Sequence, residues 1–399
     1  MKKGWEMKRL AEACLIKPPK SEAREKVSPS SLVSFLPMED LGIDVKFVKV
    51  RQSKPFSSVV GSYTYFADGD VLLAKITPCF ENGKLGIACG LENGIGFGSS
   101  EYLVFRPNTA VSKEWLYYFM SCETFRTEGA ARMSGAVGHK RVSKEFIEDY
   151  QIPIPPLSEQ QRIVSLLDEA FTGIATAKAN AHQNLQNARA IFESHLQSVF
   201  TNPGKGWVVR KVSVIAEHSL GKMLDKAKNK GEPQPYLRNI NVRWFNFNLS
   251  DLLQMPFLPT EAEKYTAIKG DVLICEGGYP GRAAIWTEDY PIYFQKALHR
   301  VRFYESEHNK WFVYYLYMQD ASGQLKSQFS GTGIQHFTGE TLARYEIPLP
   351  PISELRRAVA KFDELMKAIM TLESVYERKV TALEALKKTL LHQAFTGEL

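Results

Sequence analysis

Apolar residues recur at steps of three and four through residues 358–390, which predicts one long amphipathic helix with a coiled-coil seam. A weaker, alanine-rich stripe runs through residues 163–191, where small side chains would let a partner helix approach closely. We expect the two stripes to cover each other as an antiparallel coiled coil. The two sets of apolar positions are Ala358, Phe362, Leu365, Ile369, Leu372, Tyr376, Val380, Leu383, Leu386 and Leu390, and Ile163, Leu166, Ala170, Ile174, Ala177, Ala181, Leu185, Ala188 and Ile191.

Ahead of each helical stretch, the pattern changes to short β-prone runs between turn signals. Residues 5–13 and 207–216 each begin with tryptophan and predict a strand that runs into a short turn. Residues 69–73 (Gly-Asp-Val-Leu-Leu) and 270–274 (Gly-Asp-Val-Leu-Ile) predict a turn followed by a buried strand. We interpret this Gly-Asp signal as structural.

Each globular stretch continues with another β-like run, an aromatic helix, a glycine-rich polar loop and a last strand. The spacing of the aromatic residues fits a helix packed on a sheet, so we interpret them as core and not as a platform for stacking bases. These segments are the runs 100–106 and 298–303, the helices 115–120 and 311–316, and the loops 134–142 and 330–337.

The whole plan occurs twice. Residues 152–162 (Ile-Pro-Ile-Pro-Pro-Leu-Ser-Glu-Gln-Gln-Arg) return 195 positions later as residues 347–357 (Ile-Pro-Leu-Pro-Pro-Ile-Ser-Glu-Leu-Arg-Arg). The prolines favour an extended arm, and the Ser-Glu pair offers an N-cap and an acidic first turn for the helix that follows. The sequence therefore predicts an α+β fold with two globular mixed α/β domains in tandem, residues 1–155 and 203–350, each followed by a spacer helix, residues 156–202 and 351–399.

Composition narrows the class of protein. The 399 residues are 44% hydrophobic, which suits a chain with real cores, and we expect no membrane span and no signal peptide. Five scattered cysteines without metal-type spacing predict buried free thiols in a reducing cytoplasm. The net charge of +6 falls equally on the two globular stretches, which is weak evidence for two sites on one polyanion.

A helix over residues 158–200 would be about 65 Å long. Two domains roughly 60 Å apart would meet B-DNA, which advances about 34 Å per turn, at places one to two turns apart. The helices would then act as a ruler for a split target. A plain dimerisation coiled coil is the alternative.

Candidate binding residues lie in polar loops that differ between the two copies. Gly83-Lys84 and Gly281-Arg282 each combine a residue that permits close backbone approach with a cation suited to a phosphate or a guanine edge. A basic segment, residues 221–230, is interpreted as a surface insertion. Exposed turns with incidental polar residues remain the alternative. The candidates for DNA contact are Lys75, Asn82, Lys84, His139, Lys140, Arg141, Lys222, Arg238, Arg243, Tyr279, Arg282, Gln335 and His336.

Catalytic signals are weak. The sequence has no Gly-x₄-Gly-Lys-[Ser/Thr] loop and no Asn-Pro-Pro-aromatic run for amino-methylation. The stretch from Asp70 to Lys75 is only faintly like a metal-dependent nuclease strand, because Leu73 stands where a carboxylate is needed. We therefore expect no catalytic, cofactor or metal residues in this chain.

The chain resembles the specificity (S) subunit of type I restriction-modification systems over essentially its whole length. The resemblance rests on residues 152–163 and their repeat, on residues 76–84 (Ile-Thr-Pro-Cys-Phe-Glu-Asn-Gly-Lys) and on residues 393–399 (Gln-Ala-Phe-Thr-Gly-Glu-Leu). The second copy departs from it, with Gly-Gly-Tyr-Pro-Gly-Arg at residues 277–282. Such a difference is expected if the two targets differ.

The resemblance implies two target recognition domains, each reading one half of a bipartite sequence in double-stranded DNA, and places Lys84, Arg282 and the loops 138–141 and 333–336 in DNA-facing regions. It implies that methylation subunits dock along the spacers and supply S-adenosylmethionine and the adenine-N6 chemistry. Restriction subunits with ATP and magnesium would join that core. The competing hypotheses are a DNA methyltransferase or nuclease that acts alone, and a structural coiled-coil scaffold that binds only proteins.

Overall fold

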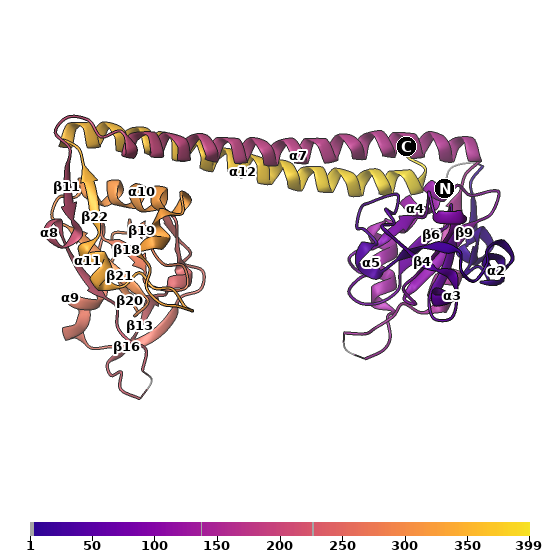
Figure 1. Ribbon diagram of the computed structural model, residues 1–399, viewed down its shortest axis with the longest axis horizontal. Coiled ribbons are helices and arrows are strands. Elements are labelled where there is room, and N and C mark those ends of the chain that lie inside the picture. Colours follow the sequence, from indigo (N-terminus) through magenta and orange to yellow (C-terminus); the bar gives the residue numbers. More distant parts are fainter. Residues whose placement is uncertain (1–3, 137, 226) are drawn as a thin grey trace. The chain divides into compact units, whose positions relative to one another are not determined.

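The computed structural model describes residues 4–136, 138–225 and 227–399. The start of the amino-terminal segment (1–3), Val137 of the first glycine-rich loop and Lys226 of the basic segment lie outside the described residues. The chain divides into two compact units, each of which contains a globular part and parts of both long helices (Figure 1). The first unit is Met1–Asn180 with Glu377–Leu399, and the second is Ala181–Tyr376.

The first unit contains two four-stranded sheets and a two-stranded ribbon. One sheet is antiparallel, in the order β2 (Cys14–Ile16), β9 (Tyr102–Pro107), β6 (Val71–Ala74), β7 (Leu85–Ile87). The other has the order β4 (Gln52–Pro55), β3 (Leu32–Leu36), β8 (Ile95–Gly98), β5 (Thr64–Ala67), with β3 and β8 parallel. The ribbon pairs β1 (Glu6–Arg9) with β10 (Gln151–Ile154). The helices of the globular part are α1 (Leu10–Ala13), α2 (Ser21–Lys26), α3 (Phe56–Val59), α4 (Lys113–Met120), α5 (Glu123–Ala131) and α6 (Lys144–Asp149).

The second unit repeats this order strand for strand. Its antiparallel sheet is β12 (Ala216–Leu220), β21 (Leu298–Phe303), β18 (Val272–Cys275), β19 (Ala283–Ile285). Its other sheet is β16 (Leu253–Phe257), β13 (Glu232–Leu237), β20 (Ile292–Phe294), β17 (Thr266–Ala267), again with one parallel pair, β13 and β20. The ribbon is β11 (Val208–Lys211) with β22 (Glu346–Leu349), and the hairpin β14 (Val242–Arg243) with β15 (Asn246–Phe247) is an addition. The helices are α8 (Val212–Ile215), α9 (Ala262–Tyr265), α10 (Glu307–Ala321) and α11 (Gly339–Arg344).

Single 3₁₀ turns join several of these elements: η1 (Met38–Asp40), η2 (Glu92–Gly94), η3 (Asn239–Asn241), η4 (Pro259–Glu261) and η5 (Gln324–Gln328). The sequence pattern predicts the glycine-rich loop directly after the aromatic helix. In the structure, α5 intervenes in the first unit and η5 in the second. The strand that leads to the prolines is preceded by α6 or α11, which the pattern does not predict.

The repeated Gly-Asp signal is structural, as predicted. The carboxylate of Asp70 is buried, accepts a hydrogen bond from the N–H of Ala67 (2.8 Å) and binds Nε and Nη2 of Arg106 on β9 (2.7 and 2.9 Å). Asp271 makes the same bidentate pair with Arg302 on β21 (2.7 Å for both bonds). Each aspartate thus closes the turn before the strand and ties that strand's start to its neighbour.

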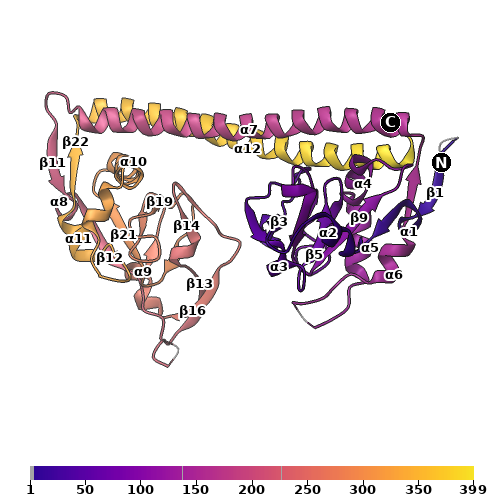
Figure 2. The ribbon, with the colours of Figure 1, turned by 45° about the vertical axis from the view of Figure 1, so that its right-hand side comes forward.

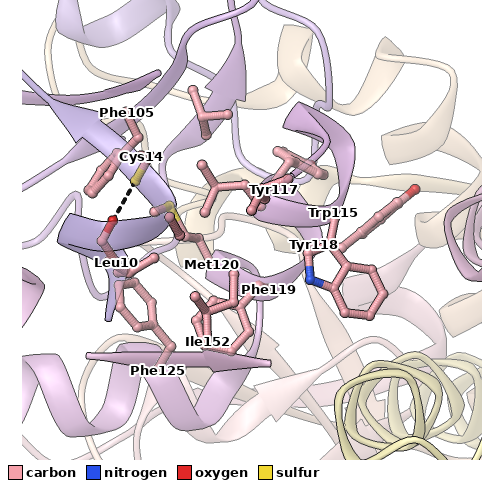
Figure 3. Close-up of a cluster of buried hydrophobic side chains, with 14 of the residues drawn as sticks. Leu10, Cys14, Phe105, Trp115, Tyr117, Tyr118, Phe119, Met120, Phe125 and Ile152 are labelled. Carbon is pink, nitrogen blue, oxygen red and sulfur yellow. Dashed lines mark hydrogen bonds between the residues drawn. The ribbon is translucent and has the colours of Figure 1, made fainter. Parts of the chain in front are cut away.

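The aromatic helices form core, which confirms the interpretation from their spacing. In the first unit, Trp115 and Phe119 of α4 are buried with Phe125, Leu10 and Cys14 (Figure 3). The indole N–H of Trp115 donates to the carbonyl of Pro153, at 2.9 Å. In the second unit, Trp311 of α10 donates in the same way to Pro348, at 2.7 Å. Each aromatic helix therefore also holds the extended arm that leads to the proline pair.

All five cysteines are free, and Cys14 and Cys275 are buried, while the other three are half-buried. The Sγ of Cys14 donates to the carbonyl of Leu10 at 2.9 Å (Figure 3), and burial raises the pKa of this thiol to about 12. No helix in the described part of the chain is both long and apolar enough to cross a membrane.

Two long helices, α7 (Leu157–Thr201) and α12 (Ile352–Thr396), pack antiparallel within each unit. In the first unit, the carboxyl-terminal part of α12 lies along the start of α7, with Lys178 paired to Glu384 at 3.0 Å. In the second unit, the start of α12 lies along the end of α7, with Nε of Arg189 bound to Glu373 at 3.0 Å. The predicted antiparallel coiled coil is confirmed within each unit.

Most positions of the predicted apolar stripes are buried or half-buried, including Ile163 and Phe362 at 0% exposure, but three are wrong. Leu166, Ile191 and Leu386 were placed in the seam but are 42%, 66% and 46% exposed. Leu167 and Phe192, the sequence neighbours of Leu166 and Ile191, are buried instead. The reason is that the helix ends also pack on the globular parts, where the rings of Phe395 and Trp115, and of Phe200 and Trp311, lie 4.5 Å apart.

Candidate nucleic-acid interface

In the first unit, the residue that follows the central strand β6 is polar, and backbone hydrogen bonds hold it in place. The N–H of Lys75 donates to the carbonyl of Glu101 (2.9 Å), and its own carbonyl accepts from the N–H of Val142 (3.0 Å). The glycine-rich loop closes beside it, because Ser134 and Arg141 exchange two backbone hydrogen bonds (3.0 and 2.8 Å). The end of β6, the start of β9 and the loop are therefore one locally rigid frame.

The second unit builds the same frame at the end of β18. The N–H of Glu276 donates to the carbonyl of Ala297 (2.8 Å), and its carbonyl accepts from the N–H of Phe337 (2.7 Å). Ser330 and His336 exchange two backbone hydrogen bonds of 2.9 Å. We call these two sets of residues the strand-end clusters. Their equivalent positions are Lys75 and Glu276, Glu101 and Ala297, and Arg141 and His336.

The loop that follows the central strand also returns to the same place in both units. Its last residue, Lys84 or Arg282, accepts a backbone hydrogen bond from Ala74 (3.1 Å) or Cys275 (2.8 Å). The preceding glycine has a φ of 75° at Gly83 and 83° at Gly281, a left-handed conformation that favours glycine. The pairing of Gly83-Lys84 with Gly281-Arg282 seen in the sequence therefore holds in three dimensions.

Cations dominate the first strand-end cluster. Arg141 donates Nε and Nη2 to the two carboxylate oxygens of Glu101 (2.9 and 2.7 Å), which lowers the pKa of Glu101. The ammonium of Lys75 lies 3.9 Å from the same carboxylate and donates to the carbonyl of Ser100 at 2.9 Å. The side chain of Lys140 is exposed next to them, as is that of His139. The cluster offers several N–H donors around one neutralised carboxylate.

The side chain of Lys84 makes a hydrogen bond within the protein. Its ammonium donates to the carbonyl of Met38 at 2.7 Å, so at least one of its N–H groups is used internally. Asn82, two residues earlier, is exposed. Of this pair, Asn82 has the more exposed side chain.

The second strand-end cluster is built from different side chains. Tyr279 is exposed, and the guanidinium of Arg282 lies 3.9 Å from the centre of its ring. Nη2 of Arg282 donates to the carbonyl of Asn239 (3.0 Å), whose amide donates to the carbonyl of Gly277 (3.0 Å). A Cβ on Gly277 would lie 3.1 Å from Nδ1 of His336, so that ring covers the loop closely. Gln335, beside His336, is exposed.

Three other candidates are engaged within the second unit. Lys222 is only 7% exposed, and its ammonium binds Glu261 at 2.6 Å and the carbonyl of Pro256 at 2.9 Å. Arg238 pairs with Asp251 at 2.7 Å. Arg243 is exposed and donates to the carbonyl of Val242 at 3.2 Å. The structure therefore brings Lys75, Lys140 and Arg141 together, and Tyr279, Arg282 and His336 together, but places Lys222 in an internal ion pair.

The candidates predicted from the sequence leave out two polar residues of these clusters, Glu101 and Glu276. The signal for Glu276 was available, since it directly follows the repeated Gly-Asp strand, as Lys75 does in the first copy. Glu101 could not be found in this way, because its contact with Arg141 bridges segments forty residues apart.

The clusters suit recognition by hydrogen bonds. Arginine, lysine, asparagine, glutamine and carboxylate side chains are the groups that read base edges and phosphates of DNA. The loop between α5 and α6 projects from the end of its globular part that is far from α7 (Figures 1 and 2). Among the described residues, no group of three or more His, Cys, Asp and Glu side chains could hold a metal ion.

Comparison with known proteins gives one consistent result. The type I restriction enzyme EcoAI specificity subunit of Escherichia coli is 30% identical over 262 residues, which cover 59% of this chain and 44% of that protein. The EcoEI specificity subunit of Escherichia coli is 37% identical over 189 residues, which cover 46% of this chain and 31% of that protein. The chain therefore spans less than half the length of these two relatives.

Solved structures share the fold. A chain from a type I R-M system aligns with a TM-score of 0.81 at 20% identity and covers 100% of this chain and 99% of its own. The HsdS subunit from Thermoanaerobacter tengcongensis aligns with a TM-score of 0.66 at 20% identity, covering 100% and 98%. A family model described as the type I restriction modification DNA specificity domain matches residues 2–186 and 204–380. This chain belongs to that family of specificity domains.

Proposed function

We propose that this chain is the DNA sequence-recognition subunit of a type I restriction-modification complex, and that each unit reads one half of a bipartite target. The observation that carries the proposal is the pair of strand-end clusters. One backbone frame occurs twice and presents different polar side chains, Lys75 with Arg141 in one unit and Glu276 with His336 in the other. Two readers with different targets need this combination of a constant frame and variable side chains.

Methylation subunits are the proposed partners along α7 and α12, and restriction subunits join them. Exposed apolar side chains on these helices, such as Leu166, Ile191 and Met370, would suit contact with another protein. In this proposal the chain is non-catalytic and acts in the cytoplasm. S-adenosylmethionine, ATP and magnesium belong to the partners.

A nuclease or methyltransferase that acts alone is less well supported. Asp70, the one carboxylate in the strand with faint nuclease character, is bound on both oxygens by Arg106 and by a backbone N–H. That arrangement serves the fold. A scaffold that binds only proteins would not need two strand-end clusters with different polar side chains.

DNA binding by the assembled complex tests the proposal. Lys140→Ala should weaken binding to duplex DNA across sequences and reduce the slope of log affinity against log salt by about one. The matched control is Lys113→Ala, because the Lys113 side chain lies beside Gly69, at the opposite end of β6. Equal affinity and salt slope for the two variants would contradict a DNA-facing cluster at the end of β6.

A further inference from the structure

The two strand-end clusters carry opposite charge at their equivalent central position. In the first unit, Glu101 is held by Arg141 and lies near Lys75, so the cluster keeps a net excess of donors. In the second unit, Ala297 stands where Glu101 would be, and Glu276 stands where Lys75 would be. The charge is therefore inverted at a position that makes the same two backbone hydrogen bonds in both units.

Glu276 is half-buried as a residue, and its carboxylate makes no hydrogen bond or ion pair with any residue that the structure describes. The nearby cation Arg282 is directed elsewhere, since it stacks on Tyr279 and donates to the carbonyl of Asn239. Glu276 thus presents hydrogen-bond acceptors and no donors.

An unneutralised carboxylate is costly beside a polyanion, because it repels phosphates and loses water on binding. The cost is offset if the carboxylate accepts a hydrogen bond from a base. In the major groove, only the exocyclic amino groups of cytosine (N4) and adenine (N6) can donate, whereas guanine and thymine present acceptors there.

We propose that Glu276 is a specificity-determining residue that selects an amino-bearing base in the half-site read by the second unit, and that Lys75 selects a keto-bearing base at the equivalent place in the other half-site. This inference rests on the proposed function. It assigns opposite chemical preferences to the two units from one pair of equivalent residues.

The test uses the chain assembled with its methylation subunits, with adenine methylation mapped on unmethylated genomic DNA. Glu276→Lys replaces acceptors by donors, so one position of one half-site should change from cytosine or adenine to guanine or thymine. Methylation at the original site should fall by about fivefold to a hundredfold. Glu276→Gln carries both donors and acceptors and should relax that single position. The base that the wild-type complex requires at this position shows whether cytosine or adenine is the natural contact.

Two controls make the result specific. Glu305→Lys makes the same charge change at an exposed residue just past the opposite end of β21 and should leave the motif unchanged. Lys75→Gln should relax one position in the other half-site only. If the Lys variant is inactive everywhere, relaxation by the Gln variant supports the proposal, and an unchanged motif in the Gln variant overturns it.

The possible outcomes distinguish a failure of this inference from a failure of the proposed function. A bipartite motif that stays the same in Glu276→Lys and Glu276→Gln, at the original rate, would overturn this inference and leave the proposed function standing. If the wild-type complex forms but methylates no bipartite motif, the proposed function itself fails.

Discussion

His299 shows how a single buried residue links this fold to pH. It lies on β21 and is buried, and burial lowers the pKa of its imidazole to about 4. A histidine in an unfolded chain titrates near 6.5. The unfolded second unit therefore takes up a proton between these pH values that the folded unit does not bind.

The stabilising contribution of neutral His299 is fully present above pH 6.5 and is lost as the pH falls toward 4, by about 3 kcal/mol in total. We expect His299→Phe to flatten the fall in the free energy of unfolding between pH 7 and pH 4.5, by about 2 kcal/mol. Urea unfolding followed by tryptophan fluorescence measures this. His182→Phe, at an exposed site on α7, is the control and should keep the wild-type slope. Parallel pH profiles for wild type and His299→Phe would contradict the assignment.

Residue roles were predictable from the sequence where the repeat keeps them the same. Asp70 and Asp271 follow a glycine in the same motif, and each binds an arginine of the neighbouring strand. The polar residues of the strand-end clusters were harder to assign, because a side chain such as Arg282 is free or engaged depending on distant neighbours like Asn239. Lys222 shows the limit of such predictions, because no residue near it in the sequence indicates its ion pair with Glu261.

Among the elements, each long helix has two contact surfaces. Along their length they face each other, and toward their ends they face the aromatic helices α4 and α10. Tyr118 donates to Asp168 in the first unit, and Tyr314 donates to Asp363 at 2.8 Å in the second. The three-and-four spacing predicted the first contact surface but not the second, so the buried stripe shifts by one residue where the globular part begins.

Adjacent leucines on α7 test this shift directly. Leu167 is 1% exposed and Leu166 is 42% exposed. Leu167→Ala should lower the free energy of unfolding by about 2–5 kcal/mol, because it removes a buried side chain and leaves a cavity. Leu166→Ala should change it by well under about 1 kcal/mol. Chemical denaturation of the two variants measures both values. A larger loss for Leu166→Ala would show that the predicted seam, and not the observed one, is the buried face.

At the scale of the whole molecule, the repeat is the most informative feature of the sequence. It predicted two units with one topology, and both four-stranded sheets recur in the same strand order. It could not predict which polar side chains the strand-end clusters bring together. Tertiary contacts decide this, and they differ between Lys75 with Arg141 and Glu276 with His336.

The ruler hypothesis concerns the length of the two long helices. Inserting four residues after Asn180 in α7, together with four after Tyr376 in α12, adds about 6 Å of helix and leaves the ion pairs Lys178–Glu384 and Arg189–Glu373 each within its own unit. We expect the unread spacer of the DNA target to lengthen by about two base pairs, at about 3.4 Å each, with both half-sites unchanged. Methylation mapping with the assembled complex measures this. A changed half-site with an unchanged spacer would contradict the ruler.

The most direct measurement is to purify this chain with its methylation subunit and to map adenine-N6 methylation on genomic DNA, with each component omitted in turn. We predict a split motif with an unspecified spacer, which appears only when both components are present. Methylation by this chain alone would make it an enzyme. An intact complex that methylates nothing would leave it a scaffold, and either result would contradict its role as the subunit that recognises the DNA sequence.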